Sequence, residues 1–292
     1  MNILITAATG TVGRSLAAAL SDAGVDVRAF VRDAAKARAI LPAGIDLAVG
    51  DFADPSSLDA ALAGVDRVFL AAPNHPDQVD WERNVIDGAR RAGVSSLVKL
   101  SAHGAERGSP VAFWDAHARI EQHLFASGVP AVVLRPTTYA TNLLGTLAGV
   151  VKDGVLVAPA AGARVAFIDP ADVAAVAAAL LTRGGRTGRT LTLTGPSALT
   201  FEQVAELFAR ELNRDVAFLA VTDEQAVAAM TSGGMPAWMA GNIVGVFRAL
   251  RGGMADLTTA TVATVTGREP RPLAPQLRAW LSMPAQASAV GR

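Results

Sequence analysis

The segment Met1-Asn-Ile-Leu-Ile-Thr-Ala-Ala-Thr-Gly-Thr-Val-Gly13 opens the chain. Its apolar run predicts a buried parallel strand, and a turn of small residues leads from it into an amphipathic helix that starts at Val12. Gly10 and Gly13 occupy the last two places of a G-x-x-G-x-x-G pattern, with Ala7 in the first. A strand, a glycine turn and a helix N-terminus can bind phosphate, because free backbone N–H groups and the helix dipole favour negative charge. The segment therefore predicts a dinucleotide-binding unit, with an ordinary β–α turn as the alternative.

Composition narrows the class of protein. Of the 292 residues, 51% are hydrophobic and 18% are charged, which is typical of a globular chain that forms one large α/β domain or somewhat more. The net charge is zero and no Lys/Arg cluster occurs, so we expect no nucleic-acid partner. The absence of cysteine excludes disulfides and thiolate chemistry, and no His or carboxylate pair has metal-ligand spacing, so no metal is expected.

Targeting signals are not evident. No basic and apolar leader precedes the first expected strand, and the most apolar stretch, residues 173–181, is too short to span a bilayer. We therefore expect a cytoplasmic protein with no membrane partner, either a monomer or a homodimer.

Strands and helices alternate along residues 1–136. After the opening strand, further strands are expected at 25–31, 47–49, 67–71, 96–100 and 131–134, with helices at 12–22, 56–62, 77–92 and 113–126. Strands separated by helices of this length indicate βαβ units, hence a parallel sheet with right-handed crossovers. The fold class is therefore α/β, a doubly wound parallel sheet that forms a nucleotide-binding domain over residues 1–136.

Strands and helices alternate less regularly over residues 137–284. We expect these residues to form a smaller α/β substrate lobe whose chain interleaves with the sheet. Expected helices are 140–152, 170–181, 235–250, 255–265 and 273–281, and expected strands are 165–168 and 190–194. Thr200 and Gln203 have the spacing of a capping box at the start of another helix. Residues 285–292 are expected to form a flexible tail.

The end of the expected strand 25–31 bears on which nucleotide binds. Arg32 follows Gly10 by 22 residues, about the offset at which such folds contact the adenosine ribose, and Lys36 lies one helical turn further on. A guanidinium can form two parallel hydrogen bonds to a 2′-phosphate, which favours NADP(H). Asp33 could instead bond the ribose diol, so NAD(H) remains the alternative.

A set of short motifs extends over residues 1–281: Thr6–Gly13, Val31–Asp33, Gly50–Phe52, Asn84–Asp87, Val98–Ser101, Ser127–Pro130, Leu134–Pro136, Phe167–Pro170 and Leu193–Pro196. As a set they resemble the NmrA-like branch of the atypical short-chain dehydrogenases, which includes quinone oxidoreductases, azoreductase-like proteins and isoflavone-reductase-type enzymes. The resemblance implies a Rossmann fold that prefers NADP(H) and carries a small C-terminal substrate lobe.

Site residues follow from the opening turn, the strand ends and this resemblance. The resemblance implies that the opening turn holds the pyrophosphate, that the strand ends contact the adenosine and that residues 136–139 contact the nicotinamide. Residues expected to contact the nucleotide are Thr6, Ala7, Ala8, Thr9, Gly10, Thr11, Val12, Gly13, Arg32, Lys36, Asp51, Phe52, Ala71, Ala72, Pro73, Ser101, His117, Pro136, Thr137 and Thr138. Residues expected to border the substrate are His75, His103, Trp114 and Tyr139.

The catalytic positions depart from the pattern of short-chain dehydrogenases, which pair a tyrosine with a lysine four residues later. This chain has Phe113 and His117 there, and its one tyrosine is Tyr139. Candidate catalytic residues are therefore His117, Ser101, which the resemblance places near the substrate carbonyl, and Tyr139. His117 could act as an acid, since imidazole donates and accepts protons near neutral pH, or it could bond the ribose.

These observations favour an NADPH-dependent oxidoreductase that transfers hydride to a small apolar or aromatic acceptor, a quinone or related conjugated carbonyl. One alternative is a redox sensor that binds NADP(H) without turning it over. Another is a tailoring ketoreductase or ene-reductase of secondary metabolism.

Overall fold

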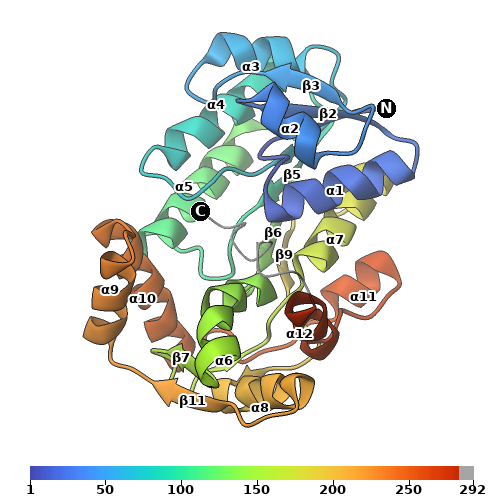
Figure 1. The fold of residues 1–292 in the computed structure, drawn as a ribbon. Coiled ribbons are helices and arrows are strands. Elements are labelled where there is room, and N and C mark those ends of the chain that lie inside the picture. Colours follow the sequence, from blue (N-terminus) through green and yellow to red (C-terminus); the bar gives the residue numbers. More distant parts are fainter. Residues whose placement is uncertain (283–292) are drawn as a thin grey trace. The chain divides into compact units, whose positions relative to one another are not determined.

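The computed structural model describes residues 1–282, which form two compact units (Figure 1). The first unit comprises Met1–Pro136, Pro170–Leu193 and Ala260–Arg268. The second comprises Thr137–Asp169, Thr194–Thr259 and the described residues from 269 to 282. The tail expected at 285–292 lies outside the described residues. Residues 170–193 and 260–268 belong to the range expected for the smaller lobe, yet they pack with the N-terminal sheet.

The first unit is built on a seven-stranded parallel sheet of order β3-β2-β1-β4-β5-β6-β9. Its strands are β1 (Asn2–Ile5), β2 (Asp26–Val31), β3 (Asp46–Val49), β4 (Arg67–Leu70), β5 (Ser96–Leu100), β6 (Ala131–Pro136) and β9 (Thr190–Leu193). In the central register Ile3 lies beside both Val27 and Arg67. Because every strand runs in the same direction, all the carboxyl ends meet at one edge of the sheet.

Helices cover both faces of this sheet, so the expected doubly wound fold is confirmed. They are α1 (Thr11–Asp22), α2 (Ala34–Ile40), α3 (Pro55–Leu62), α4 (Gln78–Arg91), α5 (Ala112–Ser127), α7 (Pro170–Arg183) and α11 (Thr261–Thr266). Leu4 packs with Leu58 of α3 and Ile120 of α5 in one buried cluster. Since neighbouring strand residues point to opposite faces, Ile3 and Ile5 face the other layer, where α1 packs against α7.

The second unit contains shorter elements. They are η1 (Ala140–Thr146), α6 (Leu147–Asp153), β7 (Val155–Ala158), β8 (Arg164–Val165), β10 (Leu199–Thr200), α8 (Phe201–Leu212), β11 (Ala217–Ala220), α9 (Asp223–Ser232), α10 (Ala237–Arg251) and α12 (Leu273–Leu281). Strands β7 and β11 pair in parallel and β8 and β10 pair antiparallel. Phe167, Phe201 and Phe208 lie in its core, and Thr200 and Gln203 form the predicted capping box. No helix within residues 1–282 has both the length and the apolar character needed to cross a bilayer.

Several expected elements differ from those observed. The helix expected at 140–152 starts as the 3-10 segment η1, and the strand expected at 165–168 is reduced to the two residues of β8. In the latter case the backbone turns, because the Phe167 N–H bonds the Val165 carbonyl. The helix expected at 255–265 begins only at Thr261, and helices α2 and α9 were not expected.

The turn between β1 and α1 is tightly packed. A Cβ atom on Gly13 would lie 2.3 Å from the Ala7 carbonyl oxygen, and one on Gly10 would lie 3.2 Å from the same atom. The Gly10 N–H also donates to that oxygen at 2.9 Å. Ala7 itself has φ 47°, the left-handed region that disfavours any residue with a Cβ atom. The turn therefore excludes side chains at Gly13 and holds Ala7 under strain.

We expect Ala7→Gly to raise the free energy of unfolding by about 0.5–1 kcal/mol, since relief of the left-handed strain outweighs the greater backbone entropy of glycine. Ala8→Gly is the matched control: Ala8 is fully buried with a negative φ, so the same change there should be destabilising. Chemical denaturation of the two variants measures both effects, and destabilisation by Ala7→Gly would contradict the strain.

Candidate functional site

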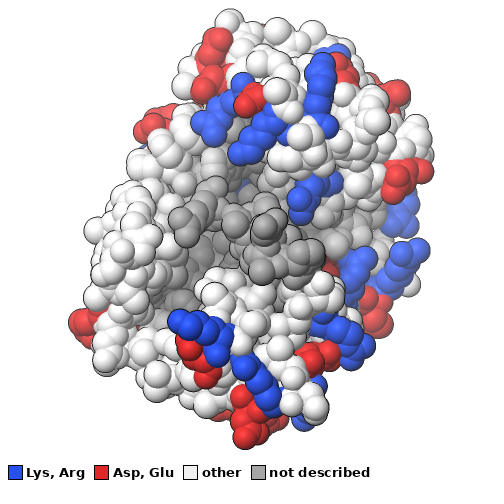
Figure 2. All heavy atoms as spheres, viewed as in Figure 1, with Lys and Arg blue, Asp and Glu red and all other residues white. Residues whose placement is uncertain are grey.

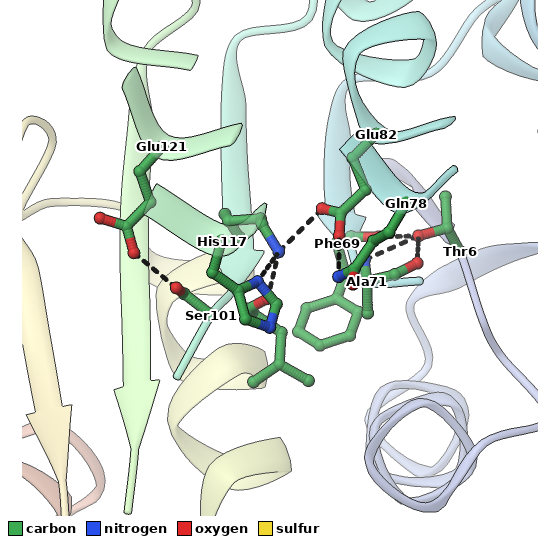
Figure 3. Close-up of polar contacts among 10 residues, drawn as sticks. Thr6, Phe69, Ala71, Gln78, Glu82, Ser101, His117 and Glu121 are labelled. Carbon is green, nitrogen blue, oxygen red and sulfur yellow. Dashed lines mark hydrogen bonds and ion pairs between the residues drawn. The ribbon is translucent and has the colours of Figure 1, made fainter. Parts of the chain in front are cut away.

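The carboxyl edge of the sheet is tied together by Thr6, directly after β1. Its hydroxyl donates to the Ala71 carbonyl at 2.7 Å and accepts from the Ala71 N–H at 2.8 Å, as Figure 3 shows. Thr6 is fully buried, so it joins the ends of β1 and β4 from inside the fold. Beyond it the chain rises to the surface, with Ala71 buried, Ala72 half-buried and Pro73 exposed.

The start of α1 presents free backbone N–H groups at this edge. Gly10 occupies the N-cap and offers no side-chain acceptor, so the amides of Thr11, Val12 and Gly13 have no partner within the helix. The side chains of Ala8 and Val12 are buried, which leaves backbone groups as their contribution to any ligand. Thr9 is half-buried and Thr11 is exposed. This glycine cradle fits the pyrophosphate of a dinucleotide.

Just after β2, the side chain of Asp33 is engaged in a hydrogen bond, whereas those of its two cationic neighbours have no such bond to any described residue. The Asp33 carboxylate accepts the Lys36 N–H at 3.0 Å and so caps α2. Arg32 and Lys36 are exposed, and within the described part of the chain neither side chain has a hydrogen bond or an ion pair. Figure 2 shows Lys and Arg side chains gathered over α2. Arg32 and Lys36 therefore place unpaired positive charge just after β2, whereas the Asp33 carboxylate caps α2.

Aromatic rings form a row near the ends of β3 and β4. The Phe52 ring lies 5.4 Å from Phe30 and stacks on Trp81 at 6.0 Å, and Trp81 stacks on His75 at 4.2 Å, all between ring centroids. Asp51 accepts the Ala53 N–H at 2.8 Å, which fixes the loop before Phe52. His75, expected at the substrate, stacks on Trp81, and Trp81 in turn stacks on Phe52, which was expected to contact the nucleotide.

Ser101, at the end of β5, is held by a buried carboxylate. Its hydroxyl donates to Glu121 Oε1 at 2.5 Å, and Glu121 also accepts a two-point contact from Arg135 at 3.0 and 2.5 Å. Glu121 comes from α5 and Arg135 from β6. The Ser101 hydroxyl proton is therefore directed at Glu121.

His117, on α5, contacts a different ion pair, which is fully buried. Lys99 Nζ lies 2.8 Å from Glu82 Oε2, and both side chains are fully buried. The same Nζ lies 3.3 Å from His117 Nδ1 and also contacts the Leu100 carbonyl. Gln78 donates to the other Glu82 oxygen at 2.9 Å. Figure 3 shows His117, Glu82 and Gln78 joined in this network.

Burial of His117 and the positive charges of Lys99 and Arg135 hold the pKa of its imidazole well below its usual value.

In the second unit, burial raises the pKa of the Tyr139 phenol, so the phenol stays protonated at neutral pH. The Tyr139 backbone bridges to Ile168, and the Thr137 hydroxyl donates to the Ala166 carbonyl at 2.6 Å.

Other expected residues lie around the β5–α5 connection. The Trp114 ring packs on Gly104, where a Cβ atom would be 2.3 Å from it. The His103 N–H donates to the Pro136 carbonyl at 3.0 Å. No group of three or more metal-binding side chains occurs among residues 1–282.

The structure thus brings Thr6, Ala71, Ser101 and His117 to the carboxyl edge of one sheet. It also reveals charged residues that sequence reasoning missed: the buried Glu82, Lys99 and Glu121, and the half-buried Arg135. The available signal was a charge inside an apolar strand, at Lys99 in β5 and Arg135 in β6.

Comparison with known proteins identifies the class. Residues 1–271 match the NmrA-like family, and the chain belongs to this family. It is 35% identical to an NAD(P)H azoreductase of Xenophilus azovorans over 93% of this chain and 95% of that protein. It is 37% identical to a (4-alkanoyl-5-oxo-2,5-dihydrofuran-3-yl)methyl phosphate reductase of Streptomyces griseus over 98% and 99%. An Escherichia coli NADPH-dependent quinone oxidoreductase, solved with NADPH, is similar with a TM-score of 0.88 at 28% identity, covering 96% of this chain and 100% of that one.

The buried neutral His117 makes stability depend on pH with a definite sign. Below about pH 6.5 the unfolded chain takes up a proton at this residue that the folded chain does not, so stability is lost as pH falls. Relative to His117→Gln, we expect the wild-type free energy of unfolding to fall by up to about 1.4 kcal/mol per pH unit between pH 6.5 and 5. Denaturant titrations at several pH values measure the difference, and parallel curves for the two proteins would contradict a neutral His117.

Proposed function

We propose that this protein is an NAD(P)H-dependent oxidoreductase that prefers NADPH. One observation carries the preference: Asp33 is engaged as the cap of α2, while Arg32 and Lys36 remain free to meet a 2′-phosphate. The amides at the start of α1 would receive the pyrophosphate. The similar azoreductase and the quinone oxidoreductase solved with NADPH support the same assignment.

For the acceptor we propose a small conjugated molecule, a quinone or related carbonyl compound. A furanyl-methyl phosphate reductase and a quinone oxidoreductase among the relatives are named for conjugated carbonyl compounds. Phe113 in place of a tyrosine leaves the first unit without the usual proton donor. Reduced nicotinamide supplies the hydride when bound, and the protein contributes mainly position and polarity. A conjugated acceptor suits such a site because its reduced form is a stabilised anion.

We expect Arg32→Ala to weaken NADPH binding by about 1.5–3 kcal/mol, the value of a hydrogen bond to a charged group, and to leave NADH binding nearly unchanged. Arg90→Ala, an exposed arginine in the last turn of α4, is the matched control. Calorimetric titration with both nucleotides measures the effect. Equal weakening of NADPH and NADH would contradict the 2′-phosphate contact.

We expect anaerobic mixing with NADPH and a panel of quinones, enones, butenolides and simple ketones to oxidise the cofactor with quinones most rapidly. Turnover confined to enones or butenolides would instead favour the ene-reductase alternative, and turnover of simple ketones a ketoreductase. Nucleotide binding without oxidation by any member would favour the sensor. Absorbance of the reduced nicotinamide gives the readout, and a variant with Gly13→Val supplies the control for cofactor dependence.

A further inference from the structure

We propose that Lys99 is a positioning residue that fixes His117 as a neutral imidazole with its hydrogen on Nε2, so that His117 donates a hydrogen bond and transfers no proton. The tautomer of His117 is argued from the Lys99 contact alone. Only the identity of the group that accepts the Nε2 hydrogen bond rests on the proposed function. The tautomer decides between the two roles that the sequence left open for His117.

The contact between the Lys99 ammonium and the His117 ring determines which ring nitrogen accepts. An ammonium group has three donors and no acceptor. Lys99 Nζ forms an ion pair with Glu82 Oε2 at 2.8 Å, contacts the Leu100 carbonyl and lies 3.3 Å from His117 Nδ1. His117 Nδ1 must therefore offer a lone pair to this contact, which places the hydrogen of the neutral ring on Nε2.

Glu82 compensates the charge of the Lys99 ammonium in this interior. An isolated buried charge is strongly unfavourable, whereas a buried pair with further hydrogen bonds can persist. Glu82 and Lys99 are both fully buried, and the Gln78 amide donates to the second Glu82 oxygen at 2.9 Å. The series of polar contacts from Gln78 through Glu82 to Lys99 thus ends in an N–H directed at His117.

The groups around His117 oppose a second proton on the ring. Lys99 from β5 and Arg135 from β6 both carry positive charge toward it. The carboxylates of the neighbouring helices are engaged elsewhere, Glu82 with Lys99 and Glu121 with Arg135 and Ser101. Protonation of Nδ1 would also set two donors face to face.

His117 Nε2 has no hydrogen-bond partner within the described residues, and 9% of the His117 surface is exposed. A neutral imidazole N–H can stabilise negative charge that develops on an oxygen atom without giving up its hydrogen. The oxygen belongs to the bound nucleotide or to the acceptor. In either case neither His117 nor the Ser101 hydroxyl, which donates to Glu121, supplies the proton that completes reduction.

Nitrogen NMR of the full-length, ligand-free protein labelled in histidine tests the assignment without any appeal to function. His117→Gln identifies the His117 signals among the four histidines. We expect one Nε2–H tautomer of His117 that does not titrate between pH 5.5 and 8. A hydrogen on Nδ1, a mixture of tautomers or titration near pH 6.5 would overturn the proposal.

The double variant Lys99→Met with Glu82→Gln removes both charges together, so neither is left buried alone. We expect His117 in this variant to show mixed tautomers and a pKa closer to the ordinary value. A His117 tautomer unchanged from wild type would overturn the role of Lys99. If the variant does not fold, the wild-type spectrum alone still decides the assignment.

Kinetics distinguish a hydrogen-bond donor from an acid. Glutamine can place an amide N–H near the position of Nε2, so His117→Gln should stay within about threefold of wild type while His117→Phe loses about tenfold. The loss appears in kcat if the oxygen belongs to the acceptor, and in the NADPH dissociation constant if it belongs to the ribose. An equal loss in both variants, with a wild-type rate that titrates near pH 6.5, would overturn the proposal.

Discussion

The close approach of α1 to β1 is the constraint on which the rest of the site depends. The space beside the Ala7 carbonyl admits only the hydrogen of Gly13, so the first helix begins directly beyond the first strand. Its unpaired amides are thereby brought to the carboxyl edge of the sheet. The Thr6 hydroxyl joins this turn to Ala71 at the end of β4, which couples the two neighbouring strands. A parallel sheet with one tight turn thus produces the anion site before any charged side chain is considered.

Beneath that edge, one buried and one partly buried ion pair determine what the remaining polar groups can do. Lys99 with Glu82 faces His117, and Arg135 with Glu121 faces Ser101. Burying such pairs is seldom favourable for stability alone, so their value lies in the orientation they impose. Each pair engages one group that could otherwise donate or accept a proton. The resulting site is polar and well ordered but poor in mobile protons, which suits hydride transfer to an acceptor that stabilises negative charge itself.

Periodicity and turn chemistry predicted most of the sheet, because buried parallel strands and capped helices leave local patterns. Strand β5 and helix α12 have the expected bounds. Helix α2 was missed although its alanine-rich segment follows the capping Asp33. The contacts of His117 and Ser101 could not be predicted, since Lys99 and Glu121 reach them from other elements of the sheet and its helices. Sequence spacing carries no record of which side chains share a buried space.

The most direct test of the central claim is whether the amides at the start of α1 receive the nucleotide. Protein labelled with nitrogen-15 would be titrated with NADPH while the backbone signals of Thr11, Val12 and Gly13 are followed. The account predicts that these three signals shift together and saturate with the nucleotide. Signals that stay in place while others saturate, or no saturable change anywhere in the spectrum, would contradict it.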